Sequence, residues 1–335
     1  MSAPKILVIS NTPFFGGGEA FIVDTLVHLR EPLYYLVRNT TLADSLPADR
    51  VFRFSKTSFA GQLSEVRRVI AGLDPDCVIF NGGRTLFFVP WVRAKRKILY
   101  RHTTNQCIGN RLKRLIYDLS LHVCYSRADA VVHVSEFARR EQKLFKDKAV
   151  CIHHGVVPLP YEPKSGSGPV RFLFLGRTEP DKGIEIIVRA FAKLPAEMAV
   201  LDVVGTGESA SWLAKLDYGN IRYHGFSKMV AEWYDSADVF VSLPRHEAFG
   251  LTILEAMNHG LPILTCRTGG IPEIVRDGEN AIVIPPVEHA VFAAMLRLCR
   301  DRSLIARMGK RSHEICCEQF SLDRTLAKIE QVINP

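Results

Sequence analysis

The sequence predicts an α/β protein built from two successive doubly wound parallel sheets. Short β-branched runs alternate with amphipathic helical stretches, which is the pattern of βα units. The alternation is interrupted once, at residues 158–169, and then restarts. A chain of 335 residues is long enough for two domains of ordinary size, each of which buries its own core.

In the first half of the chain, six apolar runs are expected to be strands. They begin at residues 5, 33, 77, 97, 130 and 149 and read KILVIS, LYYLVR, CVIF, KILYR, AVVHV and AVCIH. Between them, stretches such as 18–29 and 60–73 repeat apolar residues at helical spacing. We therefore predict a Rossmann-like domain over residues 1–157.

The second half repeats this organisation. Residues 158–169 are rich in Pro, Gly and Ser and have little periodicity, which is typical of a linker. The runs VRFLFLG, AVLDVVG, IRYHG, DVFVSL, PILT and AIVI then predict the strands of a second Rossmann-like domain over residues 170–318. The tail, residues 319–335, is expected to form a helix that packs back towards the first domain.

The composition describes a soluble globular protein, with 47% hydrophobic and 23% charged residues. The eight cysteines include no C-x-x-C pair and no metal-ligand spacing, so we expect reduced thiols. The N-terminal run KILVIS is too short for a signal peptide, and no apolar stretch approaches transmembrane length. The expected location is the cytoplasm.

The charge is unevenly distributed. Residues 1–157 hold 23 Lys and Arg against 13 Asp and Glu, a net charge of +10, whereas the rest of the chain has a net charge of −2. A basic half predicts an anionic partner, and we rank nucleic acid last because no zinc finger or RNP motif is present. The basic, apolar stretch 110–126 has two interpretations. It is either an amphipathic helix lying on anionic lipid at the inner face of the membrane, or a helix with a solvated basic face.

Several loops at predicted strand ends carry candidate binding residues, because ligands of doubly wound sheets bind at the carboxyl ends of the strands. Gly16 and Gly17 stand between a strand and a helix, where backbone can approach an anion closely. Their spacing is not G-x-G-x-x-G, which argues against a nicotinamide dehydrogenase. Arg177 and Lys182 follow a later strand, and two cations there suit a diphosphate. The ordinary alternatives are a tight turn and a pair of surface charges.

The stretch RHEAFGLTILEA, residues 245–256, places Glu247 and Glu255 on either side of an expected helix start at Gly250. They could be an acid/base pair, metal ligands, hydroxyl binders, or a cap and a solvated face. The free amides of a first helical turn favour an anion, and a carboxylate close to a diphosphate is repelled. We therefore interpret the two glutamates as hydroxyl binders at the ribose and sugar ends of a nucleotide-sugar. His102, just past a strand end, is a further candidate, although a lone histidine is more often structural.

At this point the chain resembles a known family. The motifs GRTEPDKGIEIIVRAF, VVGTGE, IRYHGF, EAFGLTILEAM and TGGIPEIVRDGENAIVIPP are similar to those of the family 4 retaining glycosyltransferases of GT-B fold, the group 1 type. In the first half the resemblance is carried by GGGEAF, RHT and VVHVSEFARR. It implies two Rossmann-like domains facing each other across a cleft. It also implies an enzyme without metal or cofactor that uses a UDP- or GDP-sugar. The donor would bind in the C-terminal domain, and the acceptor in the N-terminal domain, residues 1–157.

The resemblance also implies roles for individual residues. Arg177 and Lys182 correspond to the pair that binds the donor diphosphate and stabilises the leaving group. Glu247 corresponds to the contact with the transferred sugar, and Glu255 to the contact with the ribose. His102 corresponds to a contact with the donor sugar near the reacting carbon. The other donor-binding residues implied are the loop glycines, a residue near the base and three backbone amides: Gly16, Gly17, Phe226, Phe249, Gly250 and Leu251.

The expected reaction forms an α linkage with retention. Retaining hydrolases place two carboxylates about 5 Å apart across the bond, but both glutamates are assigned here to hydroxyl groups, so we expect front-side attack by the acceptor. The basic first domain fits a lipid-linked acceptor in bacterial envelope polysaccharide or lipopolysaccharide synthesis. The rival interpretations are a nucleotide-sugar epimerase, a phosphorylase, which would need a pyridoxal-phosphate lysine and a longer chain, and an inactive sugar-nucleotide-binding protein.

Overall fold

The computed structural model describes residues 4–103, 111–163, 166 and 168–334, which form two compact units. The first unit comprises Met1–Gly155 and Leu322–Pro335, and the second comprises Val156–Ser321. The stretch 158–169, predicted as a linker, groups with the second unit. The tail divides at Ser321, after which the chain groups with the first unit. A cleft between the two domains stays a prediction.

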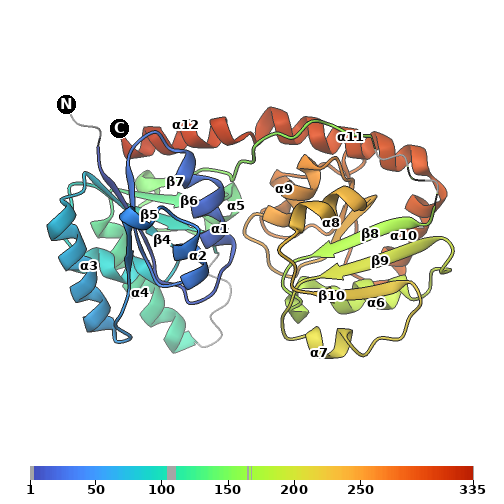
Figure 1. Ribbon diagram of the computed structural model, residues 1–335, viewed down its shortest axis with the longest axis horizontal. Helices are drawn as coiled ribbons and strands as arrows, with labels where there is room; N and C mark the ends of the chain where they lie inside the picture. Colours follow the sequence, from blue (N-terminus) through green and yellow to red (C-terminus); the bar gives the residue numbers. More distant parts are fainter. Residues whose placement is uncertain (1–3, 104–110, 164–165, 167, 335) are drawn as a thin grey trace. The chain divides into compact units, whose positions relative to one another are not determined.

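The first unit, of which Figure 1 labels the strands β4 to β7, is built on a parallel sheet with the strand order β3-β2-β1-β4-β5-β6-β7 in the part of the chain that the structure describes. Its strands are β1 (Ile6–Ser10), β2 (Leu33–Val37), β3 (Val51–Arg53), β4 (Cys77–Asn81), β5 (Lys97–Arg101), β6 (Ala130–His133) and β7 (Ala149–Cys151). The six runs predicted in this half are all strands. The strand order reverses between β1 and β4, so the ends of these two strands form the switch point at which doubly wound sheets bind ligands.

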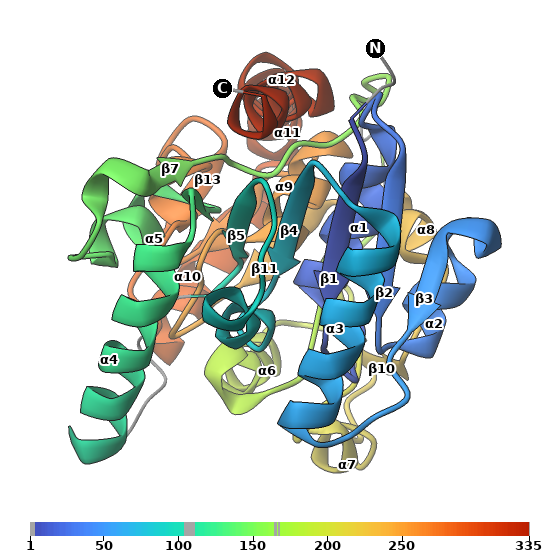
Figure 2. The same ribbon diagram turned by 90° about the vertical axis from the view of Figure 1, so that its left-hand side faces the viewer.

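Helices cover both faces of this sheet. They are α1 (Gly17–Asp24), α2 (Thr40–Asp44), α3 (Phe59–Leu73), α4 (Arg111–Arg127) and α5 (Glu136–Glu141), with 3-10 turns η1 (Leu26–His28), η2 (Ala48–Arg50), η3 (Thr85–Trp91) and η5 (Lys146–Lys148). Figure 2 looks onto α3 and α4, which share one core with the sheet through residues such as Val66, Cys124 and Leu99. On the opposite face, the ring centroids of Phe21 from α1 and Tyr100 from β5 are 4.2 Å apart.

The C-terminal helix α12 (Leu322–Ile333) belongs to the first unit. Thr325 Oγ1 donates a hydrogen bond of 3.0 Å to the carbonyl of His153, and Arg96 Nε donates one of 2.8 Å to the carbonyl of Val332. Both bonds connect α12 to segments far away in the sequence. The helix is therefore held by polar contacts with these segments as well as by its buried apolar face.

The second unit, of which Figure 1 labels the strands β8, β9 and β10, repeats the doubly wound arrangement, with the strand order β10-β9-β8-β11-β12-β13 among the described residues. Its strands are β8 (Val170–Leu175), β9 (Ala199–Val204), β10 (Ile221–Gly225), β11 (Val239–Ser242), β12 (Ile263–Thr265) and β13 (Ala281–Val283). Its helices are α6 (Ile184–Phe191), α7 (Ala210–Leu213), α8 (Val230–Ser236), α9 (Leu251–Asn258), α10 (Glu288–Arg300) and α11 (Arg302–Gln319), with 3-10 turns η6 (Pro180–Lys182) and η7 (Ile271–Glu273). The six runs predicted here are all strands.

The core of the second unit lies on both faces of its sheet. On one face, Ile187 of α6, Met295 of α10 and Leu304 of α11 pack in one cluster with the strands. On the other, the ring of Tyr234 from α8 lies 5.9 Å from that of Phe240 in β11. Within the described ranges of both units, we find no helix that combines the length and the apolar character needed to cross a bilayer.

Candidate functional site

Two neighbouring strands of the second unit bring Lys182 and Glu247 together. Lys182 ends the η6 turn after β8, and Glu247 lies in the loop after β11, which pairs with β8 in the sheet. The Lys182 Nζ atom is 2.9 Å from Glu247 Oε2, and the two side chains are only 21% and 23% exposed. Residues that are 65 positions apart therefore form a half-buried ion pair at the carboxyl edge of the sheet.

Glu247 also reaches the start of helix α9. Its Oε1 atom accepts a hydrogen bond of 3.4 Å from the backbone amide of Phe249. Gly250 caps the helix with φ +109°, and Leu251 is its first residue. The free amides of a first helical turn favour negative charge, and Lys182 offsets the charge that Glu247 adds there. We expected the two glutamates to flank the anion site as hydroxyl binders, and the structure places Glu247 beside the start of α9 with Lys182 as its cationic partner.

The backbone of Gly269 and Gly270 packs against the backbone of Glu247 and Ala248. Gly270 N donates a hydrogen bond of 3.1 Å to the carbonyl oxygen of Glu247. A Cβ atom on Gly269, where φ is +56°, would lie 1.7 Å from that same oxygen, and one on Gly270 would lie 2.3 Å from the carbonyl of Ala248. Only glycine fits at such distances. The two glycines of the TGG motif therefore fix the position of the loop that carries Glu247.

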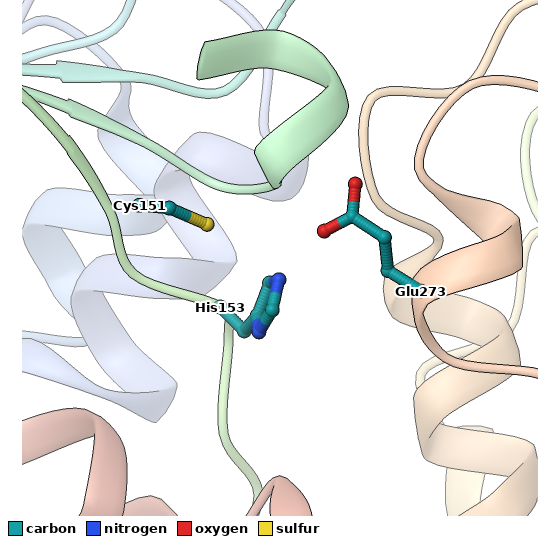
Figure 3. Close-up of side chains that lie close together, drawn as sticks. All are labelled: Cys151, His153 and Glu273. Atoms are coloured by element: carbon teal, nitrogen blue, oxygen red, sulfur yellow. The ribbon is translucent and has the colours of Figure 1, made fainter. Parts of the chain in front are cut away.

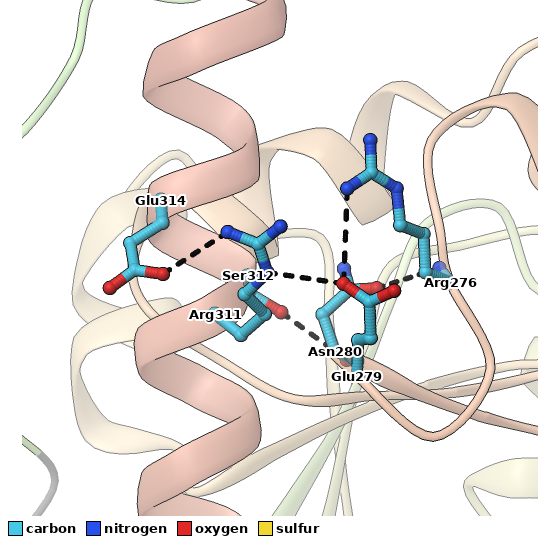
Figure 4. Close-up of polar contacts among 6 residues, drawn as sticks. All are labelled: Arg276, Glu279, Asn280, Arg311, Ser312 and Glu314. Carbon is cyan, nitrogen blue, oxygen red and sulfur yellow. Dashed lines mark hydrogen bonds and ion pairs between the residues drawn. The ribbon is translucent and has the colours of Figure 1, made fainter.

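The segment that begins at Gly269 and Gly270 runs to β13, and helix α11 holds its other end (Figure 4). The buried side-chain oxygen of Asn280 accepts a hydrogen bond of 2.7 Å from the backbone amide of Arg276, and the backbone carbonyl of Asn280 accepts one of 3.3 Å from Ser312 Oγ. Arg311 Nε is 3.2 Å from the carboxylate of neighbouring Glu279. The segment between Gly270 and β13 is thus held by hydrogen bonds at both ends.

The remaining predicted residues of the second unit lie on separate loops and helices. Arg177 follows β8 with an exposed side chain, and its Nη1 atom is 3.9 Å from Glu179 Oε1. Glu255 Oε2, on α9, accepts a hydrogen bond of 2.8 Å from the hydroxyl of Tyr234. Burial raises the pKa of Tyr234 well above 10, so its phenol keeps the proton that it donates. Phe226 follows β10 and is exposed. The ligand contacts assigned to these residues stay predictions.

In the first unit, a side chain of helix α1 accepts hydrogen bonds from the glycine loop that precedes the helix. Gly16 is extended and caps α1, which begins at Gly17. The buried carboxylate of Glu19 accepts a hydrogen bond of 3.1 Å from the amide of Gly16 and one of 2.7 Å from Ser10 Oγ at the end of β1. Thr12 also donates to this carboxylate. A buried carboxylate that is satisfied in this way holds the loop in one conformation.

His102 lies directly after β5, at the carboxyl edge of the first sheet. Its Nε2 atom is 2.7 Å from Oδ1 of Asn81, the residue that ends β4. Burial lowers the pKa of His102 to about 3, so the ring is neutral at physiological pH. Neither Asn81 nor Glu19 was among the residues predicted from the sequence. The position of Asn81, a polar residue that ends an apolar strand next to the switch point, was a signal that could have identified it.

Figure 3 draws the side chains of Cys151, His153 and Glu273, whose residue types can bind metals. Cys151 and His153 belong to the first unit, whereas Glu273 belongs to the second. Structural zinc sites use four protein ligands and catalytic ones three. Among the described residues, neither unit by itself brings three Cys, His, Asp or Glu ligand atoms together. The predicted independence from metal stays a prediction.

Comparison with known proteins connects this geometry to a family. Residues 169–301 match the family described as "Glycosyl transferases group 1". The lipopolysaccharide core biosynthesis glycosyltransferase LpsE of Rhizobium meliloti (strain 1021) is 33% identical over 153 residues, which are 44% of this chain and 44% of LpsE. The D-inositol 3-phosphate glycosyltransferase of Streptomyces bingchenggensis (strain BCW-1) is 34% identical over 185 residues, 48% of this chain and 39% of that protein. The chain spans less than half the length of these curated relatives.

Among solved structures, HepE of Anabaena in complex with UDP-glucose has a TM-score of 0.86 to this chain. The two chains are 17% identical, and the alignment covers 98% of this chain and 99% of HepE. At this identity the likeness shows the fold. It is the GT-B fold, as the sequence predicts.

Proposed function

We propose, starting from the group 1 glycosyltransferase family to which residues 169–301 belong, that the whole chain is a retaining glycosyltransferase. It would transfer a sugar from UDP or GDP to an acceptor hydroxyl with an α linkage. The observation that carries the proposal is the ion pair of Lys182 and Glu247 beside the N-terminus of α9. Support comes from HepE, which was solved with UDP-glucose, and from LpsE, whose name places it in lipopolysaccharide core biosynthesis.

In the proposed reaction the donor diphosphate binds at the first turn of α9. Lys182 and Arg177 neutralise the charge that develops on the diphosphate as the glycosidic bond breaks, and the amides of Gly250 and Leu251 add to this effect. Glu247 accepts a hydrogen bond from a hydroxyl of the transferred sugar, and Glu255 accepts one from a hydroxyl of the ribose. The acceptor hydroxyl attacks from the same face, and the departing phosphate takes its proton. Because side chains supply the positive charge, we propose that the reaction needs neither metal nor cofactor.

The first step, donor binding, is tested by thermal unfolding without added metal and with EDTA present. UDP-, GDP- and ADP-sugars are compared with the matching monophosphates and with free sugars. A donor at a hundred times its Kd should stabilise the protein by about 2.7 kcal/mol. Anomeric analysis of the product by NMR then decides between retention and inversion. If no nucleotide-sugar stabilised the protein, or if donor were turned over without any acceptor or water, the transferase proposal would be wrong.

We also propose that helix α4 rests on an anionic membrane surface, where a lipid-linked acceptor for envelope polysaccharide would be found. Leu115, Ile116, Leu119 and Val123 are between 45% and 65% exposed. At 100° per residue these four positions fall within one arc of about 100°, so they form an apolar stripe. The helix carries four Lys and Arg against one Asp, which complements anionic lipid. The side chains of residues 111–114 lie outside the described residues.

Vesicle sedimentation tests whether the apolar stripe of α4 binds anionic lipid. Phosphatidylglycerol vesicles should bind the protein, phosphatidylcholine vesicles should bind it weakly, and high salt should reduce the binding because it screens the attraction. Leu119→Gln should weaken the binding, whereas Val27→Gln, which changes an exposed apolar residue outside α4, should not. Equal binding to both vesicle types would exclude the electrostatic part of the proposal. A concentration-dependent dimer that Leu119→Gln abolishes would assign the stripe to a second copy of the chain instead.

A further inference from the structure

A hydrogen-bonded relay in the first unit joins the ends of three neighbouring strands. His102, which follows β5, has its Nε2 atom 2.7 Å from Oδ1 of Asn81 at the end of β4. Asn81 Nδ2 donates a hydrogen bond of 2.8 Å to the carbonyl of Gly18, in the first turn of the helix that follows β1. Strands β1, β4 and β5 are adjacent in the sheet. The relay therefore connects His102 to helix α1, which begins at Gly17 in the glycine loop.

The chemistry of the relay determines where the proton of His102 lies. A backbone carbonyl can only accept a hydrogen bond, so Asn81 must direct its NH₂ group towards Gly18. Its oxygen then faces the ring and must accept, so Nε2 of His102 carries the hydrogen. In a neutral imidazole the other nitrogen, Nδ1, then has a lone pair and no hydrogen. Nδ1 is buried and has no hydrogen-bond partner among the described residues.

Packing holds the ring in this orientation. Its centroid lies 5.1 Å from that of Tyr100, 5.5 Å from that of His154 and 5.2 Å from that of Phe21. A Cβ atom on Gly18 would lie 3.2 Å from Cδ2 of His102 and 3.5 Å from Nδ2 of Asn81. A larger residue at position 18 would thus press on the ring and crowd the amide. The absence of a side chain there allows the helix to approach both.

Among the described residues, the titratable groups whose rings face His102 are Tyr100 and His154, and both are uncharged at neutral pH. Burial raises the pKa of Tyr100, on β5, well above 10. Burial, together with the neighbouring His102 and His153, lowers the pKa of His154 well below its ordinary value. Neither ring supplies a negative charge that would stabilise a protonated His102. The relay therefore operates on a neutral imidazole.

We propose that Asn81 is a positioning residue that holds His102 in the Nε2–H tautomer and connects it to the first turn of α1. Nδ1 is then an acceptor and not a donor, and the hydrogen bond that it accepts comes from a sugar hydroxyl. The proposal rests on the proposed function and on the contact with the donor sugar that the family resemblance implies for His102. It assigns to the histidine the part of a fixed acceptor and excludes the part of a general acid at this nitrogen, because Nδ1 carries no proton to donate. An unpaired buried acceptor is costly, and a ligand hydroxyl would satisfy it.

The first test needs no sugar and no variant of Asn81. Long-range ¹H–¹⁵N NMR of the full chain identifies the tautomer, and His102→Gln assigns the signal by its disappearance. We expect a protonated Nε2, an unprotonated Nδ1 and no titration between pH 6 and 8. A hydrogen on Nδ1, or titration within that range, would overturn the proposal. Because this readout involves no ligand, it is independent of whether the chain is a glycosyltransferase.

The second test uses Asn81→Asp and a pH profile. The carboxylate keeps the acceptor for Nε2–H, and a negative charge at this distance raises the pKa of His102. Below the raised pKa the ring is protonated and Nδ1 can no longer accept. We therefore expect kcat/KM of the variant to fall by up to about tenfold per pH unit as the pH is lowered through that value. The wild type should not show this fall, because its His102 is already neutral there.

The matched control is Asn220→Asp, which places a carboxylate at another buried asparagine, in the second unit, whose amide also donates to a backbone carbonyl. Its pH profile should follow that of the wild type. A purely structural role for Asn81 would lower activity by the same factor at every pH. Such a uniform loss in Asn81→Asp would overturn the proposal. If Asn81→Asp did not fold, the NMR measurement on the wild type would still decide.

Discussion

Replacement of Lys182 by alanine is expected to lower turnover on the order of a hundredfold or more, because one preorganised positive charge beside the leaving diphosphate is lost. The structure adds a second cause. In the wild type, Nζ of Lys182 is 2.9 Å from the carboxylate of Glu247. Without the lysine that carboxylate stands uncompensated next to the N-terminus of α9, where the diphosphate is proposed to bind. We therefore expect KM for the donor to rise as kcat falls.

A double variant separates the two causes. Lys182→Ala combined with Glu247→Gln removes the repulsion but not the need for a cation at the diphosphate. KM for the donor should fall part of the way back to the wild-type value, whereas kcat should stay as low as in Lys182→Ala. Lys193→Ala is the matched control, because Lys193 forms an exposed pair of 2.6 Å with Glu288 in the same unit. Its activity should equal that of the wild type, whereas near-normal activity of Lys182→Ala would remove Lys182 from the mechanism.

Replacement of Gly269 by alanine is expected to destabilise the protein by about 2–4 kcal/mol and to abolish donor binding. The added Cβ would lie 1.7 Å from the carbonyl oxygen of Glu247, at a φ of +56° that alanine adopts only with strain. The backbone of the Glu247 loop must then move, because α11 holds the glycine segment at its other end (Figure 4). Urea unfolding measures the stability change, and donor-induced stabilisation measures binding.

Gly278→Ala is the control that isolates the steric clash. Gly278 has a φ of +80°, but a Cβ atom added there would meet no heavy atom within 4 Å apart from those of its chain neighbours. Alanine at this position should show only the cost of the left-handed conformation, about 1–2 kcal/mol, and donor binding should persist. Equal destabilisation by the two substitutions would mean that backbone conformation, and not the contact with Glu247, explains the effect of Gly269→Ala.

Much of the fold follows from local patterns in the sequence. All twelve predicted strands are present, since buried parallel strands are short β-branched runs between turn residues. The short strand β3 was missed because two of its three residues are exposed and it lacks an apolar run. The helix expected over 18–29 ends at Asp24 and is followed by a 3-10 turn, although the apolar spacing continues to Leu29. Periodicity therefore predicted the existence of elements better than their ends.

The sequence by itself determined which loops carry candidate chemistry, because glycines, cations and carboxylates stand next to recognisable strand ends. Only the tertiary structure decided which of these residues meet. Lys182 pairs with Glu247 because β8 lies beside β11, and Asn81 contacts both His102 and Gly18 because β4 lies between β1 and β5. Strand order is set by how the sheet buries its two faces. No local spacing encodes it, so contacts across neighbouring strand ends emerge only in the folded chain.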